Sequence, residues 1–167
     1  MTDSTAGEHP VVEQRGLWFE EFEVGTVYRH RPGRTVTEAD NVLFTTLTMN
    51  TQPLHLDEAD SAARPPFHAR LVNSMFTLST LVGLSVSQLT LGTIVANLGF
   101  SEIAFPAPVF HGDTLYGETL VVDKRPSKSR PGEGMVTLRH TARNQDGVVV
   151  ATATRATLVR MRPEEER

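Results

Sequence analysis

The chain has 167 residues, and its 39% hydrophobic content is enough for one domain to bury a core without disulfides or metal ions. Its 16 basic and 20 acidic residues give a net charge of -4 at pH 7 without a basic stripe, so we expect no nucleic-acid partner. The sequence contains no cysteine, which excludes disulfides and thiolate metal sites and fits a reducing, cytoplasmic location.

The two ends of the chain are charged and lack a periodic pattern. Residues 1–15 have neither the basic start nor the apolar run of a signal peptide, and residues 163–167 read PEEER. We predict two disordered tails at these positions and a single domain over residues 16–162. The longest apolar stretch, residues 71–91, is repeatedly interrupted by polar side chains, so we expect no membrane partner.

The first predicted elements are an edge strand and a helix. An alternating pattern that includes Tyr28 and Val36 indicates the edge strand. Thr37, followed three residues later by Asp40, resembles the capping box at a helix N-terminus, and we expect this helix to continue through Leu47.

A proline interrupts the helical pattern. Because Pro53 cannot lie inside a helix and biases Gln52 toward an extended conformation, we expect a loop over residues 50–55. Asp57 is a suitable cap for a short helix over residues 58–63.

The stretch that begins at Asn73 places apolar residues around most of a helical circumference, which predicts a helix buried on nearly all sides. The rest of the chain alternates or is β-branched, and we predict four strands, at residues 93–105, 114–124, 134–144 and 148–161. Residues 144–147 are typical of a hairpin turn. One buried helix followed by antiparallel strands is an α+β arrangement in which the sheet wraps around the helix, as in the hot-dog fold.

The loop around Pro53 resembles a family motif. Residues 50–55 are similar to the pattern Asp-x-Asn-Pro-[Leu/Ile/Val]-His of the MaoC-like dehydratase and R-specific enoyl-CoA hydratase family, with Asn50 at the Asp position and Gln52 at the Asn position. The stretches TVTEADNVLFTTLT, LVNSMFTLSTLVG and FPAPVFHGDTL are similar to further segments of the family, so the resemblance covers most of the chain. Within the family, the sequence looks most like the mesaconyl-CoA hydratase branch.

This resemblance implies a hydro-lyase that adds water reversibly to the double bond of a short enoyl-CoA thioester, with mesaconyl-CoA or a related branched or dicarboxylic acyl-CoA as candidate substrate. The acid–base pair of the family falls on Asn50 and His55, and an imidazole with an ordinary pKa of about 6.5 can exchange protons near neutral pH. The backbone N–H groups of Asn73 and Ser74, where the buried helix begins, are the implied donors to the enolate oxygen. The resemblance implies neither a metal ion nor an organic cofactor.

Asn50 departs from the family pattern, because a carboxamide cannot accept a proton as a general base. His55 could move the proton alone, while Asn50 orients the water and Asp57 or Asp40 polarises it. Catalysis could instead have been lost. A third interpretation is that the amide avoids the repulsion that an Asp would exert on a substrate carboxylate, and donates a hydrogen bond to it.

Four polar residues near the loop are candidates for substrate binding. Arg64 and Arg70 are the candidates for holding a substrate carboxylate. Gln52 and Asp57 are also candidates, although an amide can equally satisfy backbone groups in a tight loop and Asp57 equally suits a helix cap.

The loop KRPSKSRPGEG is basic, and Lys128 and Arg130 are candidates for binding the phosphates of CoA, the alternative being a solvated hairpin. His30, His68 and His140 lack metal-ligand spacing with another histidine or a carboxylate, so we expect no metal site.

Two other functions compete with the hydro-lyase. A thioesterase of this fold would need an acidic residue on the buried helix, and residues 74–91 contain none. A non-catalytic acyl-CoA-binding or partner subunit stays open because of Asn50. Since a single hot-dog sheet has an open edge, we expect at least a homodimer.

Overall fold

The structure is a computed structural model that describes residues 9–164; residues 1–8 and 165–167, which belong to the two predicted tails, lie outside the described residues. The described elements follow in chain order: η1 Phe19–Glu21, β1 Val27–Arg29, β2 Arg34–Thr35, α1 Glu38–Leu47, α2 Pro53–Leu56, α3 Glu58–Ala63, α4 Ser74–Leu89, β3 Ile94–Ala104, β4 Thr114–Pro126, β5 Glu133–Arg143 and β6 Val149–Arg160. The four predicted main strands are confirmed, with boundaries that differ by at most two residues.

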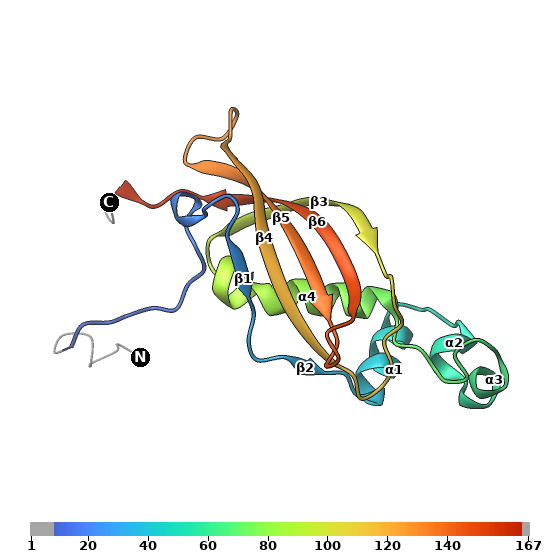
Figure 1. Cartoon of the computed structure of the whole chain (residues 1–167). Coiled ribbons are helices and arrows are strands. Elements are labelled where there is room, and N and C mark those ends of the chain that lie inside the picture. Colours follow the sequence, from blue (N-terminus) through green and yellow to red (C-terminus); the bar gives the residue numbers. More distant parts are fainter. Residues whose placement is uncertain (1–8, 165–167) are drawn as a thin grey trace.

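The strands form an antiparallel sheet that curves around α4 (Figure 1). The strand order is β1-β4-β5-β6-β3, and the short β2 pairs with the beginning of β4. The hairpins β4–β5 and β5–β6 form the centre, while β3 pairs with β6 at the outer edge. Helices α1, α2 and α3 gather at the end of the sheet where α4 begins (Figure 1). This arrangement is the predicted hot-dog fold.

Local capping explains where α1 and α3 begin. The Thr37 hydroxyl accepts a hydrogen bond from the Asp40 N–H at 3.2 Å, and the Asp40 carboxylate accepts one from the Thr37 N–H at 2.9 Å. Asp57 caps α3 by accepting a hydrogen bond from the Asp60 N–H at 2.9 Å. Both predicted helices and their caps are confirmed.

The prediction of a loop over residues 50–55 is only partly correct. Helix α2 begins at Pro53, because a proline at the first helical position needs no N–H donor and already has a helical φ. Gln52 precedes it in an extended conformation, as expected. His55 therefore lies in a helical turn.

Helix α4 is buried on one side. Asn73 caps it by accepting a hydrogen bond from the Met75 N–H at 3.0 Å, and Leu81 and Leu89 are fully buried beneath the sheet. The prediction of burial on nearly all sides is wrong, because the sheet covers a single face. Met75 is 53% exposed, and a Cβ added at Gly83 would meet nothing within 4 Å.

Alternating side chains along β4, β5 and β6 fill the core, and Leu115, Leu138 and Val159 are among those fully buried. The outer strand β3 differs, since Leu98 and Ile103 are 49% and 43% exposed. In residues 9–164, no helix combines the length and the apolarity needed to cross a bilayer.

Candidate active site

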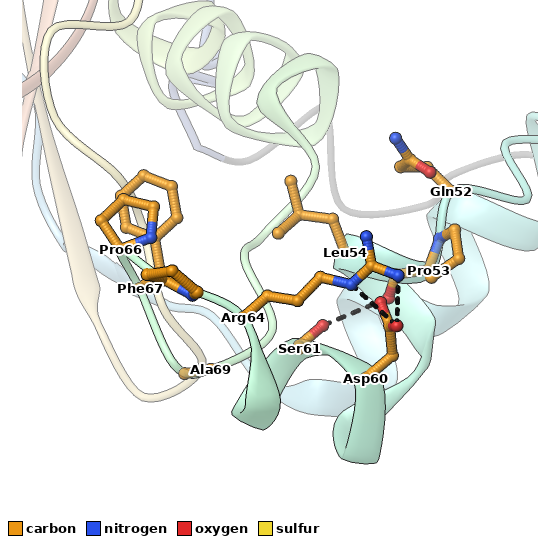
Figure 2. A pocket seen from close by; sticks show the side chains of 10 residues that line it. Gln52, Pro53, Leu54, Asp60, Ser61, Arg64, Pro66, Phe67 and Ala69 are labelled. Atoms are coloured by element: carbon orange, nitrogen blue, oxygen red, sulfur yellow. Dashed lines mark hydrogen bonds and ion pairs between the residues drawn. The ribbon is translucent and has the colours of Figure 1, made fainter.

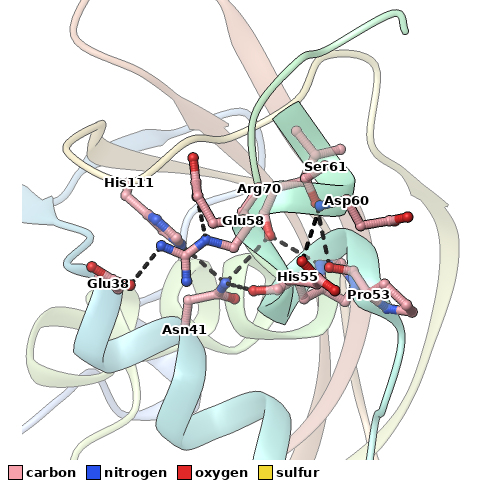
Figure 3. Close-up of polar contacts among 11 residues, drawn as sticks. Glu38, Asn41, Pro53, His55, Glu58, Asp60, Ser61, Arg70 and His111 are labelled. Atoms are coloured by element: carbon pink, nitrogen blue, oxygen red, sulfur yellow. Dashed lines mark hydrogen bonds and ion pairs between the residues drawn. The ribbon is translucent and has the colours of Figure 1, made fainter. Parts of the chain in front are cut away.

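His55 lies half-buried in α2, and one backbone group directs its imidazole (Figure 3). Its Nδ1 atom is 2.9 Å from the carbonyl oxygen of Leu71. Because a carbonyl can only accept, Nδ1 carries a proton and donates it, so in the neutral ring the lone pair is on Nε2. The imidazole is therefore oriented to act as a base at Nε2 and, once protonated there, as an acid.

Asn41, on α1, is fully buried beside His55 (Figure 3). Its Nδ2 atom is 3.2 Å from the carbonyl oxygen of His55, 3.3 Å from that of Leu71 and 3.0 Å from Nε2 of His111. Neither Asn41 nor His111 was a sequence-based candidate. The structure therefore adds two residues to the surroundings of His55.

The other end of the Asn41 amide faces the beginning of α4. Asn41 Oδ1 accepts a hydrogen bond from the Asn73 N–H at 2.8 Å, while the Asn73 side chain caps Met75. The Asn73 N–H, one of the two predicted oxyanion donors, is thus already engaged. The Ser74 N–H remains at the N-terminus of a 16-residue helix, where the positive end of the helix dipole lies.

Asn50 holds the turn that leads into α2. Its Oδ1 accepts a hydrogen bond from the Gln52 N–H at 3.0 Å, and its own N–H donates to the Thr45 carbonyl at 3.0 Å. Among the described residues, no hydrogen bond joins Asn50 to His55. The Asn50 side chain is half-buried, and among the described residues no hydrogen bond is seen from its Nδ2, which could donate to a ligand.

Arg70 connects α1 to α3 (Figure 3). Its guanidinium donates to Glu38 at 2.5 Å and to Glu58 at 2.6 Å, and its side chain is 12% exposed. Hydrogen bonds to these carboxylates raise the pKa of Arg70, and Arg70 lowers the pKa of Glu38. Because two carboxylates already neutralise Arg70, holding a substrate carboxylate would require one of these pairs to open.

His111 lies close to this charged group. Burial lowers the pKa of its imidazole, and the positive charge of Arg70 lowers it further. A neutral imidazole at neutral pH agrees with the position of His111 Nε2 opposite the Nδ2 donor of Asn41.

A pocket of about 320 Å³ opens at the beginning of α4, and we call it the Ser74 pocket. Ser74 and Thr77 line it together with apolar side chains that include Leu71 and Phe105. Leu71 is also the residue whose carbonyl orients His55. The pocket therefore combines an apolar wall with a helix N-terminus, which suits an acyl thioester. His55 is not among its lining residues and is connected to it through the Leu71 carbonyl.

A second pocket, of about 300 Å³, lies between α2, α3 and the segment that follows α3 (Figure 2). Its lining includes Gln52, Leu54, Arg64 and Phe67. The Arg64 guanidinium donates to Asp60 at 2.8 Å, and its side chain is 73% exposed. Arg64 could exchange this exposed pair for a ligand more easily than Arg70 could.

Lys128 and Arg130 belong to the loop between β4 and β5, at the end of the sheet remote from α2 (Figure 1). Arg130 forms an ion pair of 2.5 Å with Glu133. Within one chain, the structure does not bring this loop near His55. In the described part of the chain, no group of three or more histidine and carboxylate side chains gathers as a metal site would require.

Comparison with known protein families gives a match to the MaoC like domain over residues 20–144. The mesaconyl-CoA hydratase of Cereibacter sphaeroides is 32% identical over 148 residues, which are 88% of this chain and 42% of that protein. The (R)-specific enoyl-CoA hydratase of Rhodospirillum rubrum is 30% identical over 70% of this chain and 76% of its own length. The chain thus spans less than half the length of the mesaconyl-CoA hydratases that it matches.

Solved structures agree with these matches. A MaoC-like dehydratase from Rhodospirillum rubrum superposes with a TM-score of 0.78 at 33% identity, over 89% of this chain and 99% of that one. A Mycobacterium tuberculosis protein with a double hotdog fold superposes with a TM-score of 0.79 at 26% identity, over 89% of this chain and 46% of that one.

Proposed function

The chain belongs to the MaoC-like domain family, and from this membership we propose that it is a hydro-lyase that adds water reversibly to the double bond of a short enoyl-CoA thioester. The observation that carries the proposal is the orientation of His55, whose Nδ1 donates to the Leu71 carbonyl and whose Nε2 keeps its lone pair. The Ser74 pocket, at the N-terminus of α4, supports it by offering an apolar site beside a backbone donor.

The proposed reaction uses one imidazole for both proton transfers. His55 Nε2 takes a proton from water as the water oxygen bonds to the β-carbon, and the resulting imidazolium returns the proton to the α-carbon. The Ser74 N–H donates to the thioester oxygen while negative charge develops on it. Both transfers take place on one face of the substrate, and neither requires a metal ion or an organic cofactor.

Asn50 is the basis for proposing a dicarboxylic substrate. Its Nδ2 can donate to a carboxylate, whereas the Asp of the family would repel one. Several relatives carry the name mesaconyl-CoA hydratase, and mesaconyl-CoA has a free carboxylate. We therefore propose mesaconyl-CoA or a related thioester as substrate, with the exposed Arg64 as a candidate second carboxylate contact.

A second candidate function is that of a non-catalytic acyl-CoA-binding or partner subunit. The specific observation in its favour is that Asn50 cannot act as a base and that its oxygen accepts a hydrogen bond from the Gln52 N–H in the turn.

The first experiment compares wild type with His55→Ala on mesaconyl-CoA and crotonyl-CoA, following the loss of enoyl-thioester absorbance. We expect the substitution to reduce kcat by at least about 100-fold, the usual contribution of a positioned acid–base group. His9→Ala, an exposed histidine outside every helix and strand, is the matched control and should leave the rate unchanged. If wild type binds both thioesters and turns over neither, the partner-subunit function replaces the hydro-lyase.

We also propose that the chain works as a homodimer. Among the described residues, strand β3 has an unpaired edge with exposed apolar side chains, and the double hotdog relative has about twice the length of this chain. A second copy of this chain could take the place of the second half of that relative. It could also bring Lys128 and Arg130 of one copy toward the pocket of the other.

A further inference from the structure

The buried amide of Asn41 has one possible orientation. Its oxygen faces the backbone N–H of Asn73, which can only donate, and its nitrogen faces the carbonyl oxygens of His55 and Leu71, which can only accept. A flipped amide would place an oxygen against two carbonyls and an N–H against an N–H. The hydrogen-bond directions around Asn41 are therefore fixed by its neighbours.

This orientation determines the tautomer of His111. Since Asn41 Nδ2 is a donor and lies 3.0 Å from His111 Nε2, that nitrogen must accept, so the proton of the neutral imidazole is on Nδ1. In the neutral rings, His55 and His111 thus both carry their proton on Nδ1. For His55 the reason is that Nδ1 faces a carbonyl, and for His111 it is that Nε2 faces the Asn41 donor.

Asn41 forms hydrogen bonds both near the imidazole of His55 and at the beginning of α4. Through Nδ2 it binds the Leu71 carbonyl, which is the acceptor for His55 Nδ1, and it also binds the backbone carbonyl of His55 itself. Through Oδ1 it binds the N–H of Asn73, whose side chain caps the first turn of α4. One side chain therefore spans the segment that carries the imidazole and the helix N-terminus that carries the Ser74 N–H.

We propose that Asn41 is a positioning residue, which holds in place the Leu71 carbonyl that orients His55 and keeps the His55 imidazole at a fixed position relative to the N-terminus of α4. This inference rests on the proposed function for its effect on rate, but its effect on the two histidines can be measured without any substrate. Asn41 touches neither water nor thioester in the proposed reaction.

The test is ¹⁵N NMR of the imidazole nitrogens in the full chain at pH 8, with His55 and His111 assigned by substitution. In wild type we expect both rings to carry their proton on Nδ1. Protonation of His111 at Nε2 in the neutral ring would overturn the inference without any Asn41 variant.

Asn41→Asp keeps the size and the Oδ1 acceptor but replaces the donor with a second oxygen. We expect His111 to gain a proton at Nε2, with its pKa raised by more than one unit by the new carboxylate, and His55 to lose its single tautomer. We expect kcat on crotonyl-CoA to fall about 10- to 100-fold, because a small displacement of a catalytic group has an effect of this size, and we expect a smaller change in KM.

Thr46→Val is the control, because Thr46 lies on the same helix, is exposed, and donates its hydroxyl to the carbonyls of Val42 and Leu43 within that helix. It should leave both tautomers unchanged and kcat within about twofold. If Asn41→Asp does not fold, Asn41→Ala tests the same loss of the donor without adding charge. Unchanged His55 tautomer and kcat in a folded Asn41 variant would overturn the inference. If wild type hydrates no enoyl-CoA, the proposed function fails, but the NMR result still tests the positioning role of Asn41.

Discussion

A single carbonyl, that of Leu71, receives hydrogen bonds from both His55 Nδ1 and Asn41 Nδ2. Both lone pairs of this oxygen are therefore occupied, and the imidazole cannot turn without losing a bond to a buried acceptor. The orientation of His55 is a property of the backbone around it. No neighbouring carboxylate is needed for it, which is consistent with an amide at position 50.

Asn50→Asp tests the proposed preference for a dicarboxylic substrate. At about 5 Å and an effective dielectric near 20, a carboxylate at this position would repel a substrate carboxylate by about 3 kcal/mol. We expect kcat/KM for mesaconyl-CoA to fall about 100-fold, because about 1.4 kcal/mol corresponds to a factor of ten. The rate on crotonyl-CoA, which lacks the carboxylate, should not fall.

Steady-state kinetics on the two thioesters measure this difference, with Asn50→Gln as the control that keeps an amide. A loss of equal size on both substrates would refute the electrostatic explanation for Asn50.

The sequence predicts His55 as a site residue, and the structure places two further polar residues beside it. The Pro-Leu-His order singles out His55 because the motif is contiguous. Asn41 and His111 could not be identified in this way, since their contact joins residues 70 positions apart. The only local signal was a polar pair, Asn41 and Thr45, one helical turn apart, and such a pair also suits an exposed face.

Among the elements, those with local end signals were predicted well. The capping residues Thr37 and Asp57 make hydrogen bonds within three residues, so their effect is visible in the sequence. Helix α2 was missed because Pro53 was interpreted as a helix breaker, although proline is well suited to the first helical position. The exposed face of α4 was missed because apolar periodicity cannot tell which side the sheet covers.

A row of hydrogen-bonded polar side chains links α4 to strands β4 and β5. His30 Nε2 is 2.7 Å from the Thr119 hydroxyl, which is 2.8 Å from His140 Nδ1, and His30 Nδ1 is 2.9 Å from Gln88 Oε1. Burial, and next the charge of Arg155, lower the pKa of His140 to about 3. The folded protein therefore holds His140 neutral far below the pH at which an unfolded chain would protonate it.

This predicts a loss of stability at acid pH. Because the folded pKa is lower than the unfolded value of about 6.5, the unfolded state binds more protons, and stability falls as pH decreases from 6.5 toward 3. Each pH unit within this range should cost about 1.4 kcal/mol from His140 alone. Urea unfolding from pH 7 to pH 4 measures the slope, which His140→Gln should reduce by about that amount. An unchanged slope in the variant would show that His140 titrates normally.

For the molecule as a whole, the open edge at β3 is the feature that bears on assembly. The described chain leaves this edge unpaired, with Leu98, Phe100 and Ile103 exposed. Pairing with a second copy would bury these side chains and satisfy the free backbone groups of the strand.

Leu98→Glu should therefore weaken the proposed homodimer, because it places a charge in the apolar edge. We expect sedimentation equilibrium to give a dimeric mass for wild type and a mass shifted toward that of the 18.4 kDa chain for the variant. Val24→Glu is the control, since Val24 is 57% exposed and lies outside β3. A wild-type protein that is monomeric at all concentrations would refute the homodimer.

An unpaired edge of this kind also favours aggregation of a newly made chain, because unpaired strand groups beside apolar side chains can template the addition of any extended segment. Strand β3 departs from a flat ladder. Its register shifts three times against β6, and Glu102 within it has a left-handed conformation with φ of 52°. The edge thus favours a strand with matching irregularities and discourages the uniform stacking from which fibrils grow.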